Sequence, residues 1–123
     1  VVLLFGCGGD RDQSKRAVMG SVAELYADRV IVTSDNSRSE DPGAIIADIL
    51  SGMRKGTAEV IPDRAEAIRH AVLTAEPRDL ILLAGKGHEE YEIDRTGRHR
   101  FSEREIVLAA NEERNRRRTS GRP

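Results

Sequence analysis

The chain has 123 residues, of which 38% are hydrophobic and 33% charged, so it is sized for one globular domain with a single core. Aromatic residues are only 3% and the formal net charge is −1, which argues against a base-stacking nucleic-acid surface and against a field that selects polyanions or membranes. The single cysteine excludes an internal disulfide, and no apolar run approaches the roughly 20 residues of a membrane span. We therefore expect a cytoplasmic protein. A core-like strand at residue 1 suggests a piece of a longer chain.

The first part of the chain predicts a strand, a helix and a second strand. Residues 1–5 are an unbroken apolar run closed by glycines, as in a strand buried on both faces. Ser14 is placed to cap a helix that runs to about Ala27. The apolar positions of this helix share one face: Val18, Val22 and Leu25. Residues 29–33 are rich in β-branched side chains and predict the second strand.

The middle of the chain predicts two further helices around a short strand. Asp41 is placed to cap a helix with Pro42 at its first position, where proline is favoured. The apolar stripe of that helix is Ile45, Ile46, Ile49 and Leu50. A short strand is expected at residues 58–61. Asp63 with Glu66 then forms a capping-box-like start for a helix to about residue 74.

The remaining elements predict an α/β fold. A fourth strand is expected at residues 80–83, residues 91–93 and 98–101 flank an Arg-Thr-Gly turn and predict a hairpin, and Ser102 opens a last helix. Alternating strands and helices predict a Rossmann-like, mainly parallel sheet with helices on both faces. The hairpin would add antiparallel strands at one edge.

The predicted domain spans residues 1–113. Residues 114–123 hold five arginines and are expected to form a frayed helix end and a flexible tail. A nucleic-acid-binding arm is the minor alternative, since runs of charge are usually just solvated.

Three polar loops follow predicted parallel strands, so they should meet at the sheet edge where ligands bind in α/β folds. These loops are residues 6–12, 35–38 and 85–89. An arginine fork suits a carboxylate, and an acidic side chain suits an amine. Together Arg11, Arg38 and Glu89 would place two cations and one anion around a small pocket. That arrangement fits a diamino dicarboxylic acid.

Each loop also has a plainer interpretation. The glycines of residues 6–9 equally suit a tight turn, and Arg11 stands where the dinucleotide fingerprint has its third glycine. The 35–38 segment could be a polar turn. The third loop is no P-loop, although Lys86 could meet an anion, and His88 is more often structural than catalytic. Cys7 is expected to be a packed thiol, because no activating partner can be named.

The three segments together resemble the C-terminal domain of the Mur ligases. The resemblance is carried by Gly-Cys-Gly-Gly-Asp-Arg-Asp at 6–12, Ser-Asp-Asn-Ser-Arg at 34–38 and Ala-Gly-Lys-Gly-His-Glu at 84–89, and it covers nearly the whole chain. It implies a Rossmann-like domain that brings the amino acid into an ATP-dependent ligase of peptidoglycan synthesis. The best-matching branch of the family adds meso-diaminopimelate to UDP-N-acetylmuramoyl-L-Ala-D-Glu.

The resemblance also implies a division of labour in the longer ligase. ATP and Mg²⁺ are held mainly by a central domain with a P-loop, and ATP phosphorylates the γ-carboxylate of D-Glu to an acyl phosphate. The incoming amine attacks that group, and phosphate leaves. This chain would bind the amino acid, close over ATP and be inactive alone. The ligase is expected to be a monomer without nucleic-acid or membrane partners.

The family's diaminopimelate motif reads Asp-Asn-Pro-Arg, and the resemblance carries its roles onto this sequence. The matching diaminopimelate positions are Arg11, Asp35, Asn36, Ser37, Arg38, Gly85 and Glu89, and Asp10 matches a position near the nucleotide. Ser37 replaces the motif's proline and leaves the loop freer. Arg38 is kept, and it would be left unpaired by L-lysine, which lacks the distal carboxylate. No catalytic or metal-binding residue is assigned.

Two other functions stay open at this point. A non-catalytic Rossmann-like module for a nucleotide or phosphorylated ligand would use the glycine loop, with Asp35 on a ribose, but it gives Arg11 and the third loop no role. A Mur-like ligase for another amino acid would keep all three loops. A P-loop and a carbamylated lysine position upstream would favour a ligase.

Overall fold

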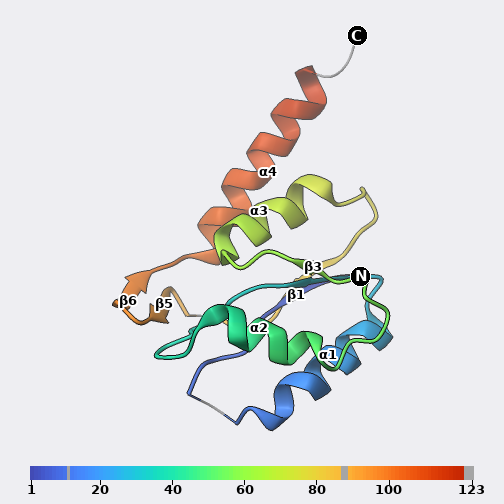
Figure 1. The fold of residues 1–123 in the computed structure, drawn as a ribbon. Coiled ribbons are helices and arrows are strands. Elements are labelled where there is room, and N and C mark those ends of the chain that lie inside the picture. Colours follow the sequence, from blue (N-terminus) through green and yellow to red (C-terminus); the bar gives the residue numbers. More distant parts are fainter. Residues whose placement is uncertain (11, 87–88, 121–123) are drawn as a thin grey trace.

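A parallel sheet forms the middle layer of the fold, between two pairs of helices (Figure 1). Its strand order is β3-β2-β1-β4. The computed structural model describes residues 1–10, 12–86 and 89–120, with side chains as far as residue 118. Its parallel strands are β1 Val2–Phe5, β2 Arg29–Val32, β3 Glu59–Val60 and β4 Ile81–Leu83. The central strand β1 pairs with β2 and β4, so that Leu3 lies opposite Val30 and Leu82. The β-branched and leucine-rich runs therefore form the strands that the sequence predicts.

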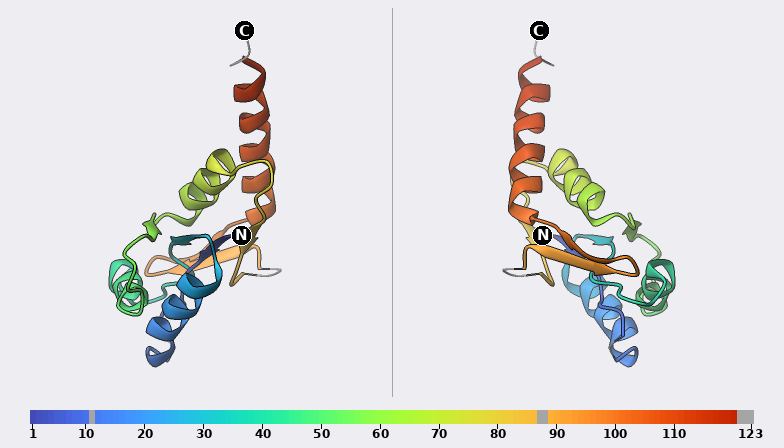
Figure 2. Two further views of the ribbon diagram at one scale, coloured as in Figure 1. Left: turned by 90° about the vertical axis from the view of Figure 1, so that its right-hand side faces the viewer. Right: turned by 90° about the vertical axis from the view of Figure 1, so that its left-hand side faces the viewer.

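Helices cover both faces of this sheet, as predicted. Within the described residues they are α1 Ser14–Tyr26, α2 Pro42–Leu50, α3 Arg64–Thr74 and α4 Glu103–Ser120. Helices α1 and α2 pack together on one face, and α3 and α4 pack together on the other. Figure 2 shows from two sides that α4 extends beyond the rest of the molecule. The three-layer α/β class is confirmed.

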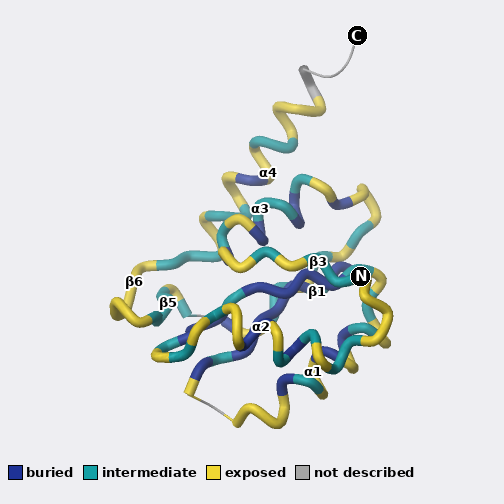
Figure 3. The backbone as a smooth tube through the Cα atoms, viewed as in Figure 1, coloured by how far each residue is buried: buried dark blue, intermediate teal, exposed yellow. Residues whose placement is uncertain are grey.

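Two hydrophobic cores lie on opposite faces of the sheet because successive strand residues point to opposite sides. Phe5 and Val32 meet the stripe of α2 on one face, while Leu4 and Ile31 meet α3 on the other. Figure 3 shows that the most buried backbone runs through the central strands. Of the α2 stripe, Ile45, Ile46 and Ile49 are buried and Leu50 packs at the margin.

Helix starts follow the predicted caps with one exception. The Asp41 carboxylate accepts from the Gly43 amide, and the Asp63 carboxylate accepts from the Ala65 and Glu66 amides. The prediction that Ser14 caps α1 is wrong, since Ser14 is the first helical residue and the cap position is Gln13. The physical reason is Asp12, whose carboxylate accepts from both the amide and the hydroxyl of Ser14.

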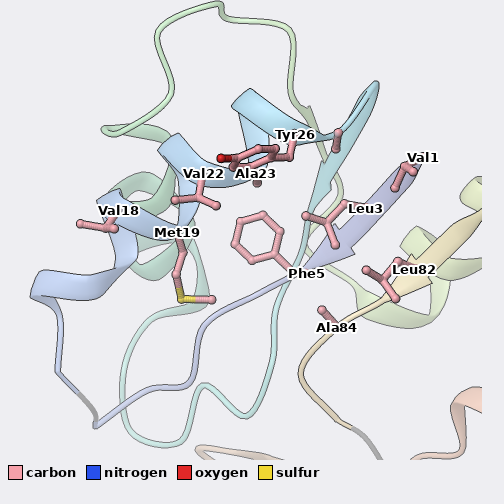
Figure 4. Close-up of a pocket in the computed structure, with 11 residues that line it drawn as sticks. Val1, Leu3, Phe5, Val18, Met19, Val22, Ala23, Tyr26, Leu82 and Ala84 are labelled. Atoms are coloured by element: carbon pink, nitrogen blue, oxygen red, sulfur yellow. The ribbon is translucent and has the colours of Figure 1, made fainter.

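The apolar stripe of α1 does share one face, but that face is exposed. Val18, Val22 and Leu25 are all surface residues, whereas the buried residues of α1 are Arg16, Gly20 and Ala23. Val18 and Val22, but not Leu25, line an apolar groove of about 380 Å³ between α1 and the β1–β4 side of the sheet. Figure 4 shows the Phe5 ring between the side chains of α1 and those of β1 and β4.

The hairpin forms its own sheet, so the expectation that it extends the edge of the main sheet is wrong. Strands β5 Tyr91–Asp94 and β6 Gly97–Arg100 pair antiparallel with each other, and their two-stranded sheet is separate from the parallel one. The backbone of Ile93 in β5 bonds to the loop after β2. The Arg38 amide donates to the Ile93 carbonyl, and the Ile93 amide donates to Asn36 Oδ1. This docking places the hairpin over the polar loops.

The arginine-rich segment begins as part of α4. The helix continues to Ser120, and the Arg114 side chain donates to the Ala75 carbonyl at the end of α3. The predicted domain boundary after residue 113 stays a prediction. In the part of the chain that the structure describes, no helix combines the length and the apolarity needed to cross a membrane.

Candidate functional site

The loops after β1, β2 and β4 meet at the carboxyl edge of the sheet, as the parallel topology predicts. The Gly9 amide donates to the Asn36 carbonyl at 3.0 Å, which joins the first loop to the second. Asn36 Nδ2 donates to Glu89 Oε2 at 3.2 Å, which joins the second loop to the third. We call this group of loops, residues 6–10, 34–40, 84–86 and 89, the loop cluster.

The centre of the loop cluster is polar and yet buried. Asp35, Asn36 and Ser37 are all buried, and buried polar side chains are stable only when they are hydrogen-bonded. Close packing of the loops contributes to this burial: a Cβ atom at Gly9 would lie 1.7 Å from the Ser37 carbonyl oxygen, so only glycine fits there. The close approach of the second loop therefore requires a glycine at position 9 of the first loop.

Lys86 supplies the main polar partner inside this centre. Only 2% of the residue is exposed, and its Nζ donates to Asp35 Oδ1 and Asn36 Oδ1, each at 3.2 Å, and to the Tyr91 carbonyl at 3.0 Å. The ammonium also lies 5.3 Å from the centre of the Phe101 ring, within cation–π range. The anion that Lys86 meets is thus the Asp35 carboxylate of its own chain.

Glu89 and Gly85 flank the same centre. Glu89 is half-buried, and its carboxylate accepts from Asn36. Gly85 has a φ of +114°, and a Cβ atom there would lie 2.5 Å from Asp35 Oδ2. A side chain at position 85 would therefore push against the carboxylate that Lys86 holds from the other oxygen.

Arg38 and Asp10 occupy the more open side of the loop cluster. Arg38 Nη1 donates to the Gly9 and Asn36 carbonyls, so this half-buried side chain bridges the first two loops. The exposed Asp10 carboxylate accepts from the Ser39 hydroxyl at 2.6 Å, and this bond lowers the pKa of Asp10. The Arg11 prediction and the structural reading of His88 lie outside the described residues.

Two buried arginines hydrogen-bond to the backbone of the loop cluster, and the sequence did not predict this role. Arg16 donates to the Gly8 carbonyl and to the carboxylates of Glu40 and Asp48. Arg64 donates to the Ser34 carbonyl at 3.3 Å, the Ala84 carbonyl at 2.9 Å and the Glu103 carboxylate at 2.9 Å. A signal was available in helical periodicity: small or apolar residues follow each arginine on its own face, at 20 and 23 and at 67, 68 and 71.

Burial shapes the acid–base state of two further groups. Burial raises the pKa of the Cys7 thiol, and Cys7 packs with its sulfur 3.6 Å from that of Met19, which confirms a packed rather than an activated thiol. Burial also raises the pKa of Glu92 on β5, against the opposing pull of Lys86 and Arg64. The electrostatic surroundings of Lys86 therefore include a carboxyl group that is harder to ionise than usual.

The chemistry that this cluster supports is recognition of a small charged molecule. Glu89 and Asp35 offer carboxylate oxygens to an ammonium group, and Arg38 offers a guanidinium to a carboxylate. Within residues 1–10, 12–86 and 89–120, no three His, Cys, Asp or Glu side chains lie close enough together to hold a metal ion. The loop cluster thus offers contacts of both charges to a small ligand.

Comparison with known proteins gives a consistent picture. A family described as Mur ligase, glutamate ligase domain, matches residues 1–87. The UDP-N-acetylmuramoyl-L-alanyl-D-glutamate–2,6-diaminopimelate ligase of Synechococcus elongatus is 52% identical over 115 residues, which is 93% of this chain and 23% of that protein. The protein of the same name from Bacillus cereus is 50% identical over 110 residues, 89% of this chain and 22% of that protein.

A solved structure is similar as well. A 2,6-diaminopimelate ligase of the same name superposes with a TM-score of 0.88 at 41% sequence identity, over 93% of this chain and 24% of that one. This chain therefore spans about a quarter of the length of the proteins that it matches.

Proposed function

The chain belongs to the Mur ligase family, and from this premise we propose that it forms the C-terminal, amino-acid-binding part of an ATP-dependent ligase that adds meso-diaminopimelate to UDP-N-acetylmuramoyl-L-Ala-D-Glu. Relatives at about half identity over nine-tenths of this chain carry that name. The observation that carries the proposal furthest is the meeting of the 35–38 motif with Glu89 through the Asn36 side chain. The product would serve peptidoglycan synthesis.

Charge complementarity supports diaminopimelate as the amino acid. We infer that its distal ammonium faces Glu89 and Asp35 Oδ2, the oxygen that does not bond Lys86. A carboxylate would face Arg38, joined by Arg11. The side-chain bonds of Arg38 to the Gly9 and Asn36 carbonyls both use Nη1, and we propose that Nη2 of its fork meets the carboxylate. A charge-assisted pair at that nitrogen would be among the stronger contacts available to the ligand.

The part that this chain plays in the reaction is to orient the amine. ATP would activate the γ-carboxylate of D-Glu as an acyl phosphate, and a correctly held amine would attack it and release phosphate. Holding two reactants in an attack geometry accelerates such steps greatly. The sequence has no P-loop and the described residues have no metal cluster, so this chain does not fit ATP–Mg²⁺ by itself. We propose that other parts of the longer ligase bind it, with Asp10 near the nucleotide.

The nucleotide-binding module is the weaker alternative in physical terms. That role asks only Asp35 to accept from a ribose, and it gives no ligand contact to Glu89, which Asn36 joins to the same motif. A ligase for another amino acid differs only in the ligand, and Ser37 in place of proline is its motivation. A monomeric state and a cytoplasmic location stay predictions from the sequence.

The test is an amino-acid panel with the intact ligase. Phosphate release with ATP and UDP-N-acetylmuramoyl-L-Ala-D-Glu would be measured with meso-diaminopimelate and with L-lysine. We expect kcat/KM to be at least about a hundredfold lower for L-lysine, because it leaves a positioned arginine without a carboxylate. Equal use of both amino acids would contradict the assignment to diaminopimelate.

Arg38→Ala provides the residue-level test of the same proposal. It should raise KM for meso-diaminopimelate by about tenfold or more, with little change for ATP or the nucleotide dipeptide. Arg95→Ala is the matched control, since Arg95 is an exposed neighbour that bonds to the Ser39 carbonyl. Equal losses for all three substrates in Arg38→Ala would point to a disturbed fold instead.

A further inference from the structure

Lys86 contacts the side chains of two adjacent residues in the 35–38 motif. Its ammonium is buried, and it lies 3.2 Å from both Asp35 Oδ1 and Asn36 Oδ1. Neither the family match nor the resemblance gives this lysine a role toward the amino acid. The three donor positions of an ammonium are all used here, since the third bond goes to the Tyr91 carbonyl.

This contact fixes which way the Asn36 amide points. Asn36 Oδ1 accepts from two donors, Lys86 Nζ and the Ile93 amide, so both of its lone pairs are occupied. The amide nitrogen must then point the other way, and it donates to Glu89 Oε2. The position of the Glu89 carboxylate, which is the proposed ammonium contact, therefore depends on Lys86 through Asn36.

The same ammonium controls the Asp35 carboxylate. The side chains of Lys86 and Asp35 are 0% and 11% exposed, so water contributes little to the solvation of this pair. The lysine occupies Oδ1, and Gly85 lies against Oδ2, which sets the side chain in one orientation. A buried carboxylate whose cation is removed becomes strongly unfavourable and must move or take up a proton.

Lys86 is itself held by elements outside the loops. Its bond to the Tyr91 carbonyl ties it to the start of β5, and its cation–π contact ties it to Phe101, just before α4. The hairpin and the segment before α4 thus fix the position of the ammonium. That position in turn fixes the orientation of the Asp35 and Asn36 side chains.

We propose that Lys86 is the positioning residue of the amino-acid site. Lys86 orients Asn36 and Glu89 and holds Asp35 in place, but it does not itself contact the incoming diamino acid. This inference rests on the proposed function of the loop cluster as the site for the amino acid. It gives the third loop a function that the phosphate-binding interpretation of Gly-Lys could not supply.

Arg64 offers a matched comparison, because it is equally buried and fastens the same two loops. Its guanidinium donates to the Ser34 and Ala84 carbonyls and to Glu103, which are backbone and helix contacts rather than the motif side chains. If a buried cation acts here only by stabilising the loops, removing Lys86 and removing Arg64 should have the same kinetic consequences.

The experiment compares Lys86→Met, Lys86→Arg and Arg64→Met in the intact ligase, with KM measured separately for the amino acid, ATP and the nucleotide dipeptide. Each variant would be assayed at a temperature at which its circular dichroism is that of the folded protein. We expect Lys86→Met to raise KM for the amino acid at least tenfold and the other two by less than about twofold. Lys86→Arg keeps the positive charge but spreads it over a longer, forked side chain, so we expect a smaller increase in KM for the amino acid.

Three outcomes would overturn the proposal. One is an unchanged KM for the amino acid in Lys86→Met, and another is a proportional rise of all three KM values, as expected for Arg64→Met. The third is failure of both Lys86 variants to fold, which would assign this lysine to folding alone.

The wild-type measurement separates this inference from the proposed function. If the wild-type ligase rejects meso-diaminopimelate but uses another amino acid, the proposed substrate is wrong, and KM for that other amino acid still tests Lys86. A wild-type protein that joins no amino acid to the nucleotide dipeptide would overturn both.

Discussion

At the scale of single residues, backbone strain is concentrated in the loop cluster. Among the described residues, the non-glycine residues with positive φ are Asp10, Asn36 and Arg38, at 55°, 42° and 54°. Each such residue costs about 1–2 kcal/mol, and it persists only where its surroundings hold it. Bonds between loops provide that restraint, as when the Gly9 amide and Arg38 Nη1 both meet the Asn36 carbonyl. Strain of this kind is typical of ligand sites.

A pair of glycine substitutions separates backbone strain from damage to the site. Gly85 and Gly97 have nearly the same φ, +114° and +119°, but a Cβ atom would strike Asp35 only at Gly85, since nothing lies within 4 Å of it at Gly97. We expect both alanine variants to lose about 1–3 kcal/mol of unfolding free energy from strain. Only Gly85→Ala should also raise KM for the amino acid. Chemical denaturation and steady-state kinetics check this, and equal kinetics for the two variants would contradict it.

Glu92 provides a pH-dependent prediction. Because burial raises the pKa of Glu92 above its ordinary value of 4.5, the folded chain holds this proton more tightly than the unfolded chain. Stability from this group is therefore complete below the unfolded-state pKa and is lost as pH rises through the folded-state pKa. Glu92→Gln cannot ionise, so it should be more stable than the wild type at neutral pH.

The measurement is urea denaturation of both proteins across the acidic to neutral range. The stability difference between Glu92→Gln and the wild type should shrink as pH falls through the raised folded-state pKa and should be gone below the ordinary glutamate pKa of 4.5. A difference that stays constant across the whole range would show that the substitution acts through packing and not through the proton.

The sequence predicted that the three loops meet, because topology alone decides which loops lie at the same edge of the sheet. Asp35, Asn36 and Glu89 follow parallel strands, so their convergence required no knowledge of side-chain contacts. The partner of Lys86 could not be predicted in the same way. Whether a lysine meets a ligand or its own chain depends on distances of a few ångströms, which the sequence pattern does not contain.

At the scale of elements, α3 and α4 are joined by a buried ion pair at the back of the site. Arg64 at the start of α3 and Glu103 at the start of α4 lie 2.9 Å apart, with side chains 0% and 14% exposed. The same arginine reaches the loops after β2 and β4. Movement of α4 would therefore shift Arg64 and, through it, the backbone of the loop cluster.

Two substitutions in the first turn of α4 test this connection. Glu103→Gln leaves the buried Arg64 without its carboxylate and should cost about 3 kcal/mol of unfolding free energy. Glu105→Gln removes the same charge from the same turn, but its pair with Arg100 has side chains 61% and 69% exposed, so the cost should stay below about 1 kcal/mol. Equal costs, measured by urea denaturation of both variants, would show that α4 is held by other contacts.

Element positions were predictable from periodicity, whereas the face that each helix buries was less so. The α2 stripe is buried as predicted, because its isoleucines face the sheet directly. Helix α1 instead buries Gly20 and Ala23 and leaves Val22 at the surface. Periodicity identifies which residues share a face, but packing of α1 against α2 decides which face is covered.

At the scale of the whole molecule, the proposed amino-acid site is built within this chain, while we assign the proposed chemistry on ATP to other parts of the longer ligase. The three loops and the hairpin that cover it all lie between residues 6 and 100, and the chain is about a quarter as long as its relatives. Recognition and phosphoryl transfer would therefore be separable functions of one ligase.

We expect the 123-residue chain alone to have no ligase activity. It lacks the phosphate loop that would position ATP, so no acyl phosphate would form on the nucleotide dipeptide. Phosphate release with all three substrates present would be measured after circular dichroism has shown that the chain is folded. ATP-dependent release that requires the amino acid would contradict the expectation.

The strand order has a consequence for folding during synthesis on the ribosome. The central strand β1 is complete at Phe5, its neighbour β2 ends at Val32, and its other neighbour β4 ends only at Leu83. A nascent chain must therefore carry β1 with one unpaired edge until most of the domain has been translated. Pairing between such distant segments is slow, and exposed strand edges invite misassembly, so we expect the emerging chain to be most open to misassembly before β4 pairs with β1.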